Sequence, residues 1–325
     1  MTVPTHGDDE SARVCLIHAG AIGDFILALR VVGSLRSHFP TAAVDVLGHQ
    51  AIASLAVGRG GVDSVTSLER LRVHTMFSED GPVDSSCVAY FASFGMIVNM
   101  YATAEQTFTR RLHEISSARV VTIDTAPRSR TRHVTEDWLD DLRAGGITPS
   151  PSPPTLRFGD DERRQGRQRL CGLTGDGDGP IVLVHPGSGG RTKCWPLERF
   201  VGLAEALRTT GARCVFMLGP VELERHGETI ESRLSAIAPV LVEGDLVRVA
   251  TIIAAADAYV GNDAGMTHLA AATGTPTVAI FGPTDPAVWR PLGEHVTVVR
   301  GDRLDTFDGV TVERVAEAAD ASLRT

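Results

Sequence analysis

The amino-acid sequence predicts an α/β protein built from two Rossmann-like, doubly wound domains that face each other across a cleft. Short apolar runs alternate with helical patterns in both halves of the 325-residue chain, which indicates parallel strands joined by helical crossovers. A proline-rich stretch separates the halves. The halves also open alike, with "VCLIHAGAIG" at 14–23 and "IVLVHPGSGG" at 181–190, so we expect equivalent first strands.

The N-terminal half carries the first strand–turn–helix pattern. The apolar run at 13–18 predicts a buried strand, and Gly20 and Gly23 punctuate the turn after it. Apolar residues at helical spacing predict a helix at 24–39. We expect further strands at 42–48, 62–68, 86–94 and 118–124, and a helix at 133–146.

A proline-rich stretch marks the boundary between the domains. Four prolines lie among the six residues 149–154, and such a segment is stiff and extended. We therefore expect one domain over 1–155 and a second over 156–325, with the last helix free to pack back on the first domain.

The C-terminal half repeats the alternation. We expect strands at 180–187, 212–219, 258–263 and 276–282. We expect helices at 196–211, 222–238, 246–257, 266–274 and 310–323. Ligands of open parallel sheets bind at the carboxyl ends of the strands, where the glycine turns of this sequence lie. The cleft between the two domains is therefore the expected site.

The composition excludes several classes of protein. The chain is 43% hydrophobic and 22% charged, which is typical of a globular protein. Its formal net charge of −9 argues against nucleic-acid binding and against electrostatic docking on anionic lipid. A local basic patch remains open at "RSRTRH" (128–133), although a solvated loop is the favoured interpretation.

The cysteines and the chain start indicate a cytoplasmic protein. The cysteine count is odd and no Cys-x-x-Cys pair exists, which argues against a disulfide framework and against a zinc site. The polar stretch at 1–13 lacks an apolar signal segment. No apolar run reaches the roughly 18 residues of a membrane-spanning helix.

Lys193 is the only lysine among the 31 lysine and arginine residues. In an arginine-rich protein, a surface lysine is replaced at little cost, whereas a site that needs a compact point charge retains it. Lys193 lies in the glycine-rich stretch "HPGSGGRTKCWP" (185–196). Glycines there let backbone N–H groups approach an anion, which predicts a phosphate cradle closed by Lys193. A glycine-rich surface turn is the alternative, because the stretch is neither a Walker A loop nor a dinucleotide fingerprint.

Asp24 follows the first glycine turn, in "HAGAIGDF" (18–25). One interpretation is a carboxylate at a helix start, stabilised by the helix dipole. The other is a carboxylate that faces the cleft and accepts a proton from a substrate hydroxyl.

Three stretches of the second half place polar residues after a strand. Glu222 follows the strand at 212–219, where acidic residues often hold ribose hydroxyls, although a solvated helix start is the commoner case. In "VGNDAGMTHLA" (260–270), Asp263 ends a strand and a ligand has room at the following helix N-terminus. His268 in that helix is either a ligand or a core histidine. The proline-rich loop at 281–291 is either a binding wall or a purely structural element.

Taken together and in this order, 185–196, 262–276 and 281–291 resemble the ADP-heptose:lipopolysaccharide heptosyltransferase family, glycosyltransferase family nine. Its pattern is H-P-G-S-G-x…K-x-W-P, then N/D-x-G-x-x-H-L-A-A-x-G-T-P, then F-G-P-T-x-P…W…P. "GAIGDFILALR" (20–30) is similar to its N-terminal glycine–glycine–aspartate motif. The resemblance leaves residues 60–165 without a recognised motif.

The resemblance implies a GT-B fold and an inverting glycosyltransferase that needs neither a metal nor a cofactor, since the ADP-sugar is a substrate. It implies that the first domain binds a glycan or glycolipid acceptor near Gly20 and Gly23. Asp24 would be the general base on the acceptor hydroxyl. The second domain would bind ADP-heptose or a similar nucleotide sugar.

The resemblance also implies a set of donor-binding residues. Ser188, Gly189 and Lys193 would hold the diphosphate, and Glu222 would hold the adenosine ribose. Asp263, Ala264, Gly265 and His268 would line the diphosphate and the sugar. The family usually has threonine where Ala264 stands, so this chain lacks one hydroxyl donor there.

Two alternatives stay open. A GT-B epimerase or hydrolase would convert a nucleotide sugar without an acceptor, and a non-catalytic module would bind it without turnover. No motif names the acceptor. Lipopolysaccharide inner core is the family default, and it implies at most peripheral contact of a cytoplasmic enzyme with the inner membrane.

Overall fold

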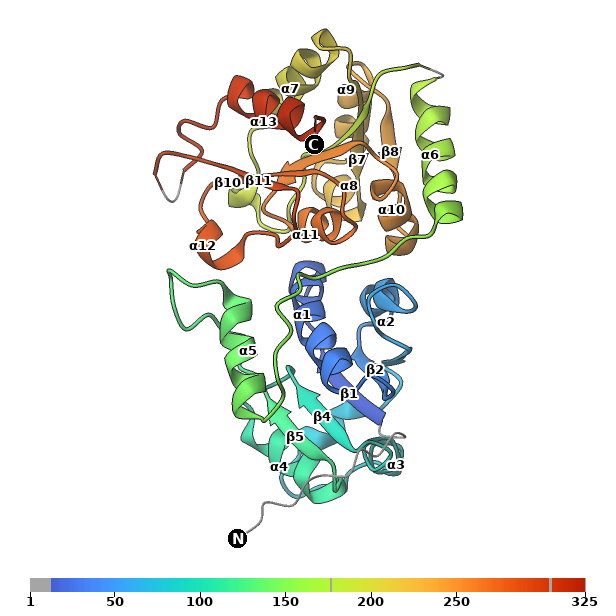
Figure 1. The fold of residues 1–325 in the computed structure, drawn as a ribbon, viewed down its shortest axis with the longest axis vertical. Coiled ribbons are helices and arrows are strands. Elements are labelled where there is room, and N and C mark those ends of the chain that lie inside the picture. Colours follow the sequence, from blue (N-terminus) through green and yellow to red (C-terminus); the bar gives the residue numbers. More distant parts are fainter. Residues whose placement is uncertain (1–12, 176, 304–305, 325) are drawn as a thin grey trace. The chain divides into compact units, whose positions relative to one another are not determined.

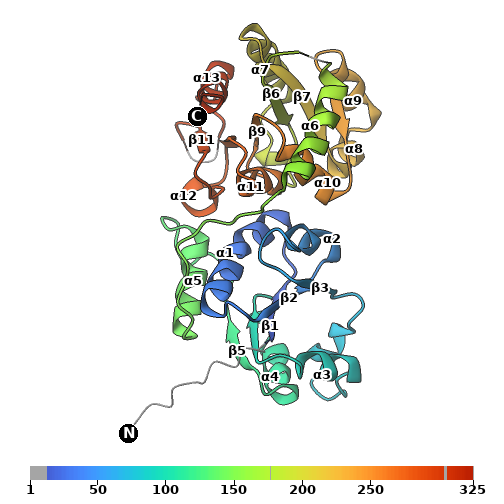
Figure 2. The same cartoon turned by 45° about the vertical axis from the view of Figure 1, so that its right-hand side comes forward.

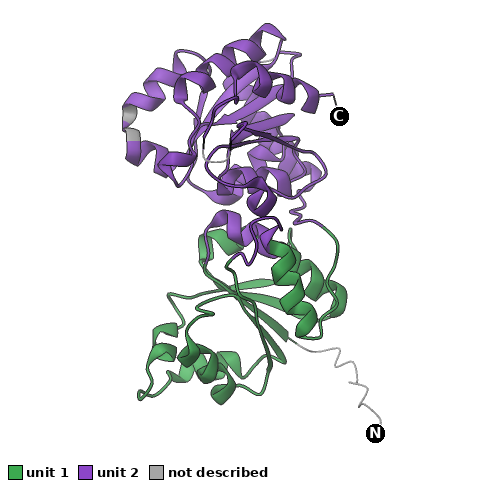
Figure 3. Ribbon diagram, turned by 90° about the vertical axis from the view of Figure 1, so that its left-hand side faces the viewer, with its two compact units in different colours: residues 1–19, 30–126, 135–152 green, residues 20–29, 127–134, 153–325 purple. Residues whose placement is uncertain are grey.

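The computed structural model of the chain describes residues 13–175, 177–303 and 306–324, so the expectation for the polar N-terminal stretch lies almost wholly outside the described residues. The chain divides into two compact units (Figure 3). Unit 1 contains residues 1–19, 30–126 and 135–152, and unit 2 contains residues 20–29, 127–134 and 153–325. Two short segments of the N-terminal half therefore group with unit 2. The last segment of unit 2 begins right after Ser152, inside the proline-rich stretch.

Unit 1 is built on a parallel five-stranded sheet with the order β3-β2-β1-β4-β5. Its strands are β1 (Arg13–His18), β2 (Ala43–Gly48), β3 (Ser64–Ser67), β4 (Met96–Asn99) and β5 (Arg119–Thr122). Its helices are α1 (Ile22–His38), α2 (Gln50–Ala53), α3 (Ser85–Phe91), α4 (Gln106–Ile115) and α5 (Val134–Ala144), with 3₁₀ turns at Ser54–Ala56 and Val73–Phe77.

One face of this sheet packs on α3 and α4, through Cys15, Ile17, Ile97, Phe91 and Phe108. Since side chains alternate along a strand, Val14 and Leu16 point to the opposite face and are also fully buried. Both faces of the sheet are therefore covered, as expected for a doubly wound parallel sheet.

Unit 2 is built on a parallel six-stranded sheet with the order β11-β10-β9-β6-β7-β8. Its strands are β6 (Ile181–His185), β7 (Arg213–Leu218), β8 (Val240–Val242), β9 (Ala258–Asn262), β10 (Thr277–Phe281) and β11 (Val296–Arg300). Its helices are α6 (Asp160–Thr174), α7 (Leu197–Thr209), α8 (Pro220–His226), α9 (Glu228–Ser235), α10 (Leu246–Ile253), α11 (Gly265–Ala272), α12 (Pro286–Trp289) and α13 (Val312–Ser322) (Figure 1).

Both units have the same strand order when their strands are counted from the first strand of each. Each sheet starts at a central strand, β1 or β6, runs outward on one side and then continues on the other side of that strand. The prediction of equivalent first strands is confirmed. The reversal in unit 2 lies between β6 and β9, which pair in parallel, and such a reversal opens a ligand site at the carboxyl ends of the two strands.

The helices of unit 2 cover both faces of its sheet (Figure 2). Helix α7 and the last helix, α13, pack together over one face, and α6 packs on α10 over the other. Helix α13 contacts α7, β9, β10 and β11 within unit 2.

Several predicted elements differ from the observed ones. The stretch 86–94, predicted as a strand, belongs mainly to helix α3, whose N-cap Asp84 accepts a hydrogen bond from the Ser86 N–H. The true neighbouring strand, β4, has only four residues and was not predicted. The single helix predicted at 222–238 is two helices, because Gly227 between them has φ +63°. Gly23 lies in the first turn of α1 rather than in the turn before it.

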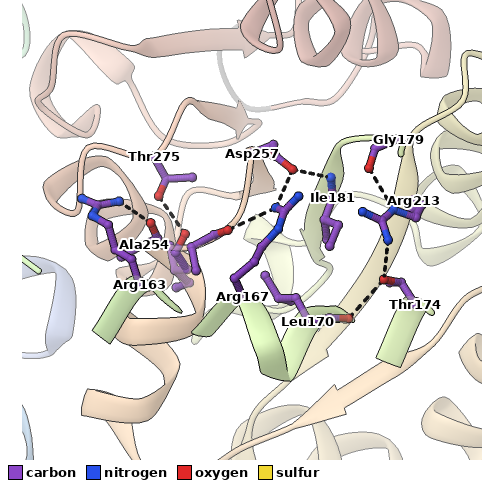
Figure 4. Close-up of polar contacts among 12 residues, drawn as sticks. Arg163, Arg167, Leu170, Thr174, Gly179, Ile181, Arg213, Ala254, Asp257 and Thr275 are labelled. Atoms are coloured by element: carbon purple, nitrogen blue, oxygen red, sulfur yellow. Dashed lines mark hydrogen bonds and ion pairs between the residues drawn. The ribbon is translucent and has the colours of Figure 1, made fainter. Parts of the chain in front are cut away.

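Helix α6 ties the start of unit 2 to its sheet through arginine side chains (Figure 4). Arg163 donates to the carbonyl of Ala254 at the end of α10. Arg167 bonds Asp257 at 2.7 Å, and the same carboxylate oxygen accepts from the Ile181 N–H at the start of β6. The pairing thus fixes α6, the end of α10 and the first strand of the sheet together.

A close approach of α6 to α10 depends on Gly166. A Cβ atom at this position would lie 2.4 Å from the Thr251 carbonyl oxygen and 2.8 Å from the Ala255 Cβ. Gly172, on the same helix, has no atom within 4 Å of the corresponding position. The two glycines therefore form a matched pair, one packed and one exposed.

We expect Gly166→Ala to lower the free energy of unfolding by about 1–3 kcal/mol, because the added methyl group overlaps backbone atoms that cannot move away. The matched control, Gly172→Ala, should raise it by up to about 1 kcal/mol through the better helix propensity of alanine. Urea unfolding of both variants measures the two effects. Equal stability of the two variants would contradict the close α6–α10 contact.

Among the residues that the structure describes, no helix combines the length and the apolar composition needed to cross a membrane.

Candidate functional site

The glycine-rich loop after β6 approaches the carboxyl end of β9, at the reversal point of the unit 2 sheet. The loop ends in a short 3₁₀ helix, Arg191–Lys193, which carries the single lysine. Arg225 of α8 holds the outer side of the loop by donating to the carbonyls of Ser188 and Gly189, at 3.0 Å each. The loop is therefore fixed by a side chain that the sequence analysis did not single out.

Asn262, the last residue of β9, holds the inner side of the same loop. Its Nδ2 donates to the carbonyls of Pro186 at 2.8 Å and Gly187 at 3.3 Å, and its Oδ1 accepts from the Trp195 N–H at 2.9 Å. Asn262 is fully buried. The sequence analysis missed this residue too, although it stands beside Asp263 in the chain.

Lys193 and Asp263 form an ion pair at the centre of the site. Lys193 Nζ lies 2.8 Å from Asp263 Oδ2, and the same oxygen accepts from the Thr284 hydroxyl at 2.5 Å. The Ser188 hydroxyl donates to the Asp263 carbonyl at 3.1 Å. The Asp263 side chain is 5% exposed and the Lys193 side chain is 36% exposed. The bond to Asp263 thus holds the ammonium group in place, while the partly exposed Lys193 side chain can still contact a ligand.

Helix α11 begins next to this ion pair with an N-terminus that no side chain caps. Its N-cap residue is Ala264, which makes no side-chain hydrogen bond to the helix. The first N–H groups of a helix carry a partial positive charge and favour anions. An anion that contacts Lys193 therefore has a second positive group close by.

His268, one turn into α11, is buried and uncharged at neutral pH. Burial lowers the pKa of His268 to about 4, an effect that the neighbouring Asp263 carboxylate opposes. Its Nδ1 has no hydrogen-bond partner among the described residues. The ring packs against Gly23, where a Cβ would lie 3.2 Å from His268 Cδ2. His268 can therefore offer a neutral donor or acceptor, but no positive charge.

Asp24 lies in the first turn of α1, in the segment that groups with unit 2. Burial raises its pKa above the ordinary value; the Ala21 backbone hydrogen bond and the Lys193 charge lower it, and the Asp263 charge raises it. Gly265 contacts the same turn, because a Cβ on Gly265 would lie 2.9 Å from Gly23 N. The predicted base is thus within electrostatic reach of the predicted anion site, and its raised pKa makes it a better proton acceptor. Gly20 lies just before α1, in the turn after β1.

Glu222 lies in the first turn of α8 and is buried. Its Oε2 accepts from the Gly219 N–H at 2.8 Å and lies 3.7 Å from His185 Nε2. Burial opposes its ionisation, but His185 and the backbone N–H groups outweigh burial and hold the pKa of Glu222 below its usual value. A Cβ at Gly187 would overlap this carboxyl group, so Gly187 leaves space for Glu222 beneath the loop.

The proline-rich loop after β10 joins the site through Thr284 and also lines a cavity of about 570 Å³. Arg128 and Arg130 line the same cavity, together with Trp289 of α12. Both arginines are exposed, in keeping with the solvated loop that was favoured from the sequence. The cavity thus contains two arginines and Thr284, which bonds Asp263.

The structure brings together Ser188, Lys193, Asp263, Gly265, His268, Gly23 and Asp24 around the reversal point of the unit 2 sheet. Gly189 belongs to the same loop, and Glu222 lies beneath it. Asn262, Arg225 and Thr284 are additional members that hold this constellation by hydrogen bonds. The described residues contain no group of three or more histidine, cysteine and acidic side chains that could hold a metal ion. Chemically, the arrangement places a cation and a helix N-terminus, both of which attract anions, next to a carboxylate with a raised pKa.

Comparison with known proteins agrees with this arrangement. Residues 130–314 match the model of glycosyltransferase family 9 (heptosyltransferase), and this range contains the whole constellation except the α1 segment. The chain belongs to glycosyltransferase family 9. It is therefore a glycosyltransferase, and the resemblance inferred from the three stretches of sequence is confirmed.

Individual family members are similar to the chain over most of its length. Lipopolysaccharide heptosyltransferase 3 of Escherichia coli K12 is 23% identical, over 84% of this chain and 83% of its own. A glycosyltransferase family 9 structure from Veillonella parvula superimposes with a TM-score of 0.77 at 18% identity, covering 96% of this chain and 97% of that one. A heptosyltransferase of E. coli, solved with ADP-2-deoxy-2-fluoro heptose, has a TM-score of 0.66 at 20% identity, covering 95% and 99%. The predicted GT-B fold is confirmed.

The uncapped start of α11 yields a prediction about stability. Ala264 has the extended backbone of an N-cap residue, with φ −153° and ψ 159°. A hydroxyl at this position can accept a hydrogen bond from the first turn, so Ala264→Thr should raise the free energy of unfolding by about 0.5–2 kcal/mol. Ala264→Val has the same shape without the hydroxyl and serves as the control. Equal stability of the threonine and valine variants in urea unfolding would show that α11 is already capped in another way.

Proposed function

We propose that this glycosyltransferase moves a heptose from ADP-heptose to a hydroxyl group of a lipopolysaccharide-core-like glycan, with inversion at the anomeric carbon and without a metal ion. The observation that carries the proposal is the convergence of Lys193 and the uncapped α11 N-terminus beside Asp24. The names of the relatives support the sugar and the acceptor, and the E. coli structure with an ADP-heptose analogue supports the donor.

The donor diphosphate fits the positive end of the site. Lys193 supplies a full charge, and the N–H groups at the start of α11 supply partial charges on the same ligand. In the structure the Ser188 hydroxyl donates to the Asp263 carbonyl. When the donor is bound, the hydroxyl can rotate and donate to a phosphate oxygen instead. We assign Glu222 to the ribose, as the resemblance implies, because its ionised carboxylate accepts hydrogen bonds from hydroxyl groups.

The transfer is a single displacement. The acceptor oxygen attacks the anomeric carbon of the heptose while the bond from that carbon to the diphosphate oxygen breaks. Asp24 takes the proton of the acceptor hydroxyl, and ADP leaves with the bonding electron pair. Attack opposite to the leaving group inverts the configuration at the anomeric carbon.

In this proposal no metal ion is required, because groups of the protein stabilise the negative charge that develops on the leaving diphosphate. Preorganised donors and a cation at the place where charge develops lower the barrier, since they need no reorganisation during the reaction. Lys193 is held for this task by its bond to Asp263. The raised pKa of Asp24 favours proton transfer from the acceptor in the same step.

The acceptor side is supported by the arginine-lined cavity. Arg128 and Arg130 line it together with Thr284, and two arginines favour an acceptor with carboxylate or phosphate groups. A lipid-linked acceptor would bring a cytoplasmic enzyme to the inner membrane through peripheral contact. Of the alternatives from the sequence, a non-catalytic binding module has no use for a base beside the anion site. A hydrolase or an epimerase would use one, so the dependence of turnover on an acceptor separates these two from a transferase.

We expect purified protein to release ADP from ADP-heptose only when a deacylated lipopolysaccharide core acceptor is present. Asp24→Asn should bind ADP with the affinity of the unchanged protein and lose transfer by about 10²–10⁴-fold, because an amide cannot take the proton. Mass spectrometry of ADP and of the glycosylated acceptor measures both reactions. A chelator should leave the rate unchanged.

The stability of the folded protein, which depends on the protonation of Asp24, supplies a second readout of the same variant. Since the folded-state pKa of Asp24 is raised, its ionised form costs stability at neutral pH, and this cost disappears as the pH falls through the folded pKa. Asp24→Asn should therefore be at least as stable as the unchanged protein at pH 7.

ADP release without acceptor would favour the hydrolase, and binding without any turnover would favour the non-catalytic module. Normal transfer by Asp24→Asn would overturn the assignment of the base.

A further inference from the structure

Asn262 makes hydrogen bonds that reach both ends of the glycine-rich loop. Its carboxamide contacts the carbonyls of Pro186 and Gly187 where the loop begins and the N–H of Trp195 where the loop ends. Each of these backbone groups would otherwise need a different partner in a buried environment. One side chain therefore closes the ten-residue loop at its base.

The loop between these contacts presents the two groups that meet an anion. Ser188 follows Gly187 directly, and Lys193 stands two residues before Trp195. Asp263, which follows Asn262 in the chain, bonds Lys193 through its carboxylate and Ser188 through its carbonyl. Asn262 thus holds the two ends of the loop, and Asp263 holds Ser188 and Lys193 within it. Both residues stand at the end of the same strand.

The Trp195 end of the loop is further anchored within unit 2. The Trp195 ring is buried, donates through Nε1 to the Val310 carbonyl at 3.1 Å and packs edge-on against Phe200. The loop end is therefore rigid on the side of the core. The two ends of the loop are joined to β9 by the Asn262 carboxamide, which therefore sets their distance from this strand.

We propose that Asn262 is a positioning residue for the donor: it fixes the loop so that Lys193 and the Ser188 backbone meet the diphosphate, without touching the donor itself. This inference rests on the proposed use of an ADP-sugar. The loss of the three hydrogen bonds releases both ends of the loop from β9 and leaves only the bonds of Ser188 and Lys193 to Asp263 at this strand end. Binding of the diphosphate must then include the ordering of the loop. The affinity for ADP falls, while the chemistry of the bound donor is preserved.

Asn99 offers a matched control in the other sheet. It is equally buried, ends the interior strand β4 of unit 1, and its Oδ1 accepts from the Tyr101 N–H at 3.0 Å within its own turn. Its Nδ2 has no partner among the described residues. An alanine at either position removes a buried carboxamide at the end of an interior strand, but only Asn262 is bonded to the glycine-rich loop.

The test compares Asn262→Ala, Asn262→Ser and Asn99→Ala in the full chain by calorimetric titration with ADP, with melting temperatures and transfer kinetics measured alongside. We expect Asn262→Ala to raise the Kd for ADP and the KM for the donor by at least about tenfold, since several hydrogen bonds are lost. The kcat and the fraction of protein that binds should stay near the values of the unchanged protein. Asn262→Ser, whose hydroxyl can keep one of the bonds, should show a smaller shift, and Asn99→Ala should show none in the Kd.

A merely structural role would give a different pattern. It would lower the melting temperature and the binding fraction of both alanine variants and leave the Kd of the folded fraction unchanged, which would overturn the inference. If Asn262→Ala does not fold, Asn262→Ser decides by the same criterion. Failure of the unchanged protein to bind ADP would overturn the proposed donor itself, and the inference with it.

Discussion

The parallel pairing of β6 with β9 is the constraint on which the rest of the site depends. The two strands are separated by more than seventy residues, and their pairing brings their carboxyl ends side by side at the reversal of the sheet. The glycine-rich loop leaves from one end and Asn262 and Asp263 stand at the other. The hydrogen bonds by which Asn262 and Asp263 hold the loop therefore span this strand pair. Without the pairing, neither the ion pair nor the start of α11 would lie beside the loop.

The ion pair between Lys193 and Asp263 turns this frame into a chemical site. A buried carboxylate is costly unless it is paired and hydrogen-bonded, and Asp263 has both a cation and the Thr284 hydroxyl. The same pairing immobilises the ammonium group before any ligand arrives, so less entropy is lost on binding. Asp263 also acts on Asp24, because its negative charge raises the pKa of that carboxyl. One aspartate thus holds the anion-binding cation and favours the proton acceptor.

Most of the fold was predictable from the sequence because buried parallel strands are continuous apolar runs. The four predicted strands of the second half are all present, and both sheets start at the expected strands. The prediction for 86–94 was wrong for a local reason. Cys87 and Phe91 are four residues apart on the buried side of α3, and Val88 is exposed, which is a helical pattern within an apolar stretch. The strand β4 was missed because the apolar stretch that continues into it from α3 was assigned its strand at 86–94, before β4 begins.

The candidate site was predictable to the extent that its residues stand out in type. Glycines in a turn, a single lysine and an aspartate at a strand end mark chemistry that a sequence can display. Asn262, Arg225 and Thr284 were missed because each acts by hydrogen bonds to groups far away in the chain, and no spacing announces such contacts. The burial of Glu222 was equally hidden, since it depends on the absence of a side chain at Gly187. Contacts between residues far apart in the chain thus determine the part of the site that the sequence alone does not show.

The most direct test of the central claim uses the fact that Lys193 is the only lysine. Its side chain is partly exposed, so an amine-reactive ester should acylate Nζ, and peptide mass spectrometry can follow the rate at this one residue. If Lys193 holds the donor diphosphate, saturating ADP should slow the acylation strongly, whereas adenosine, which lacks the diphosphate, should not. An unchanged rate in ADP, or equal protection by adenosine, would contradict the account.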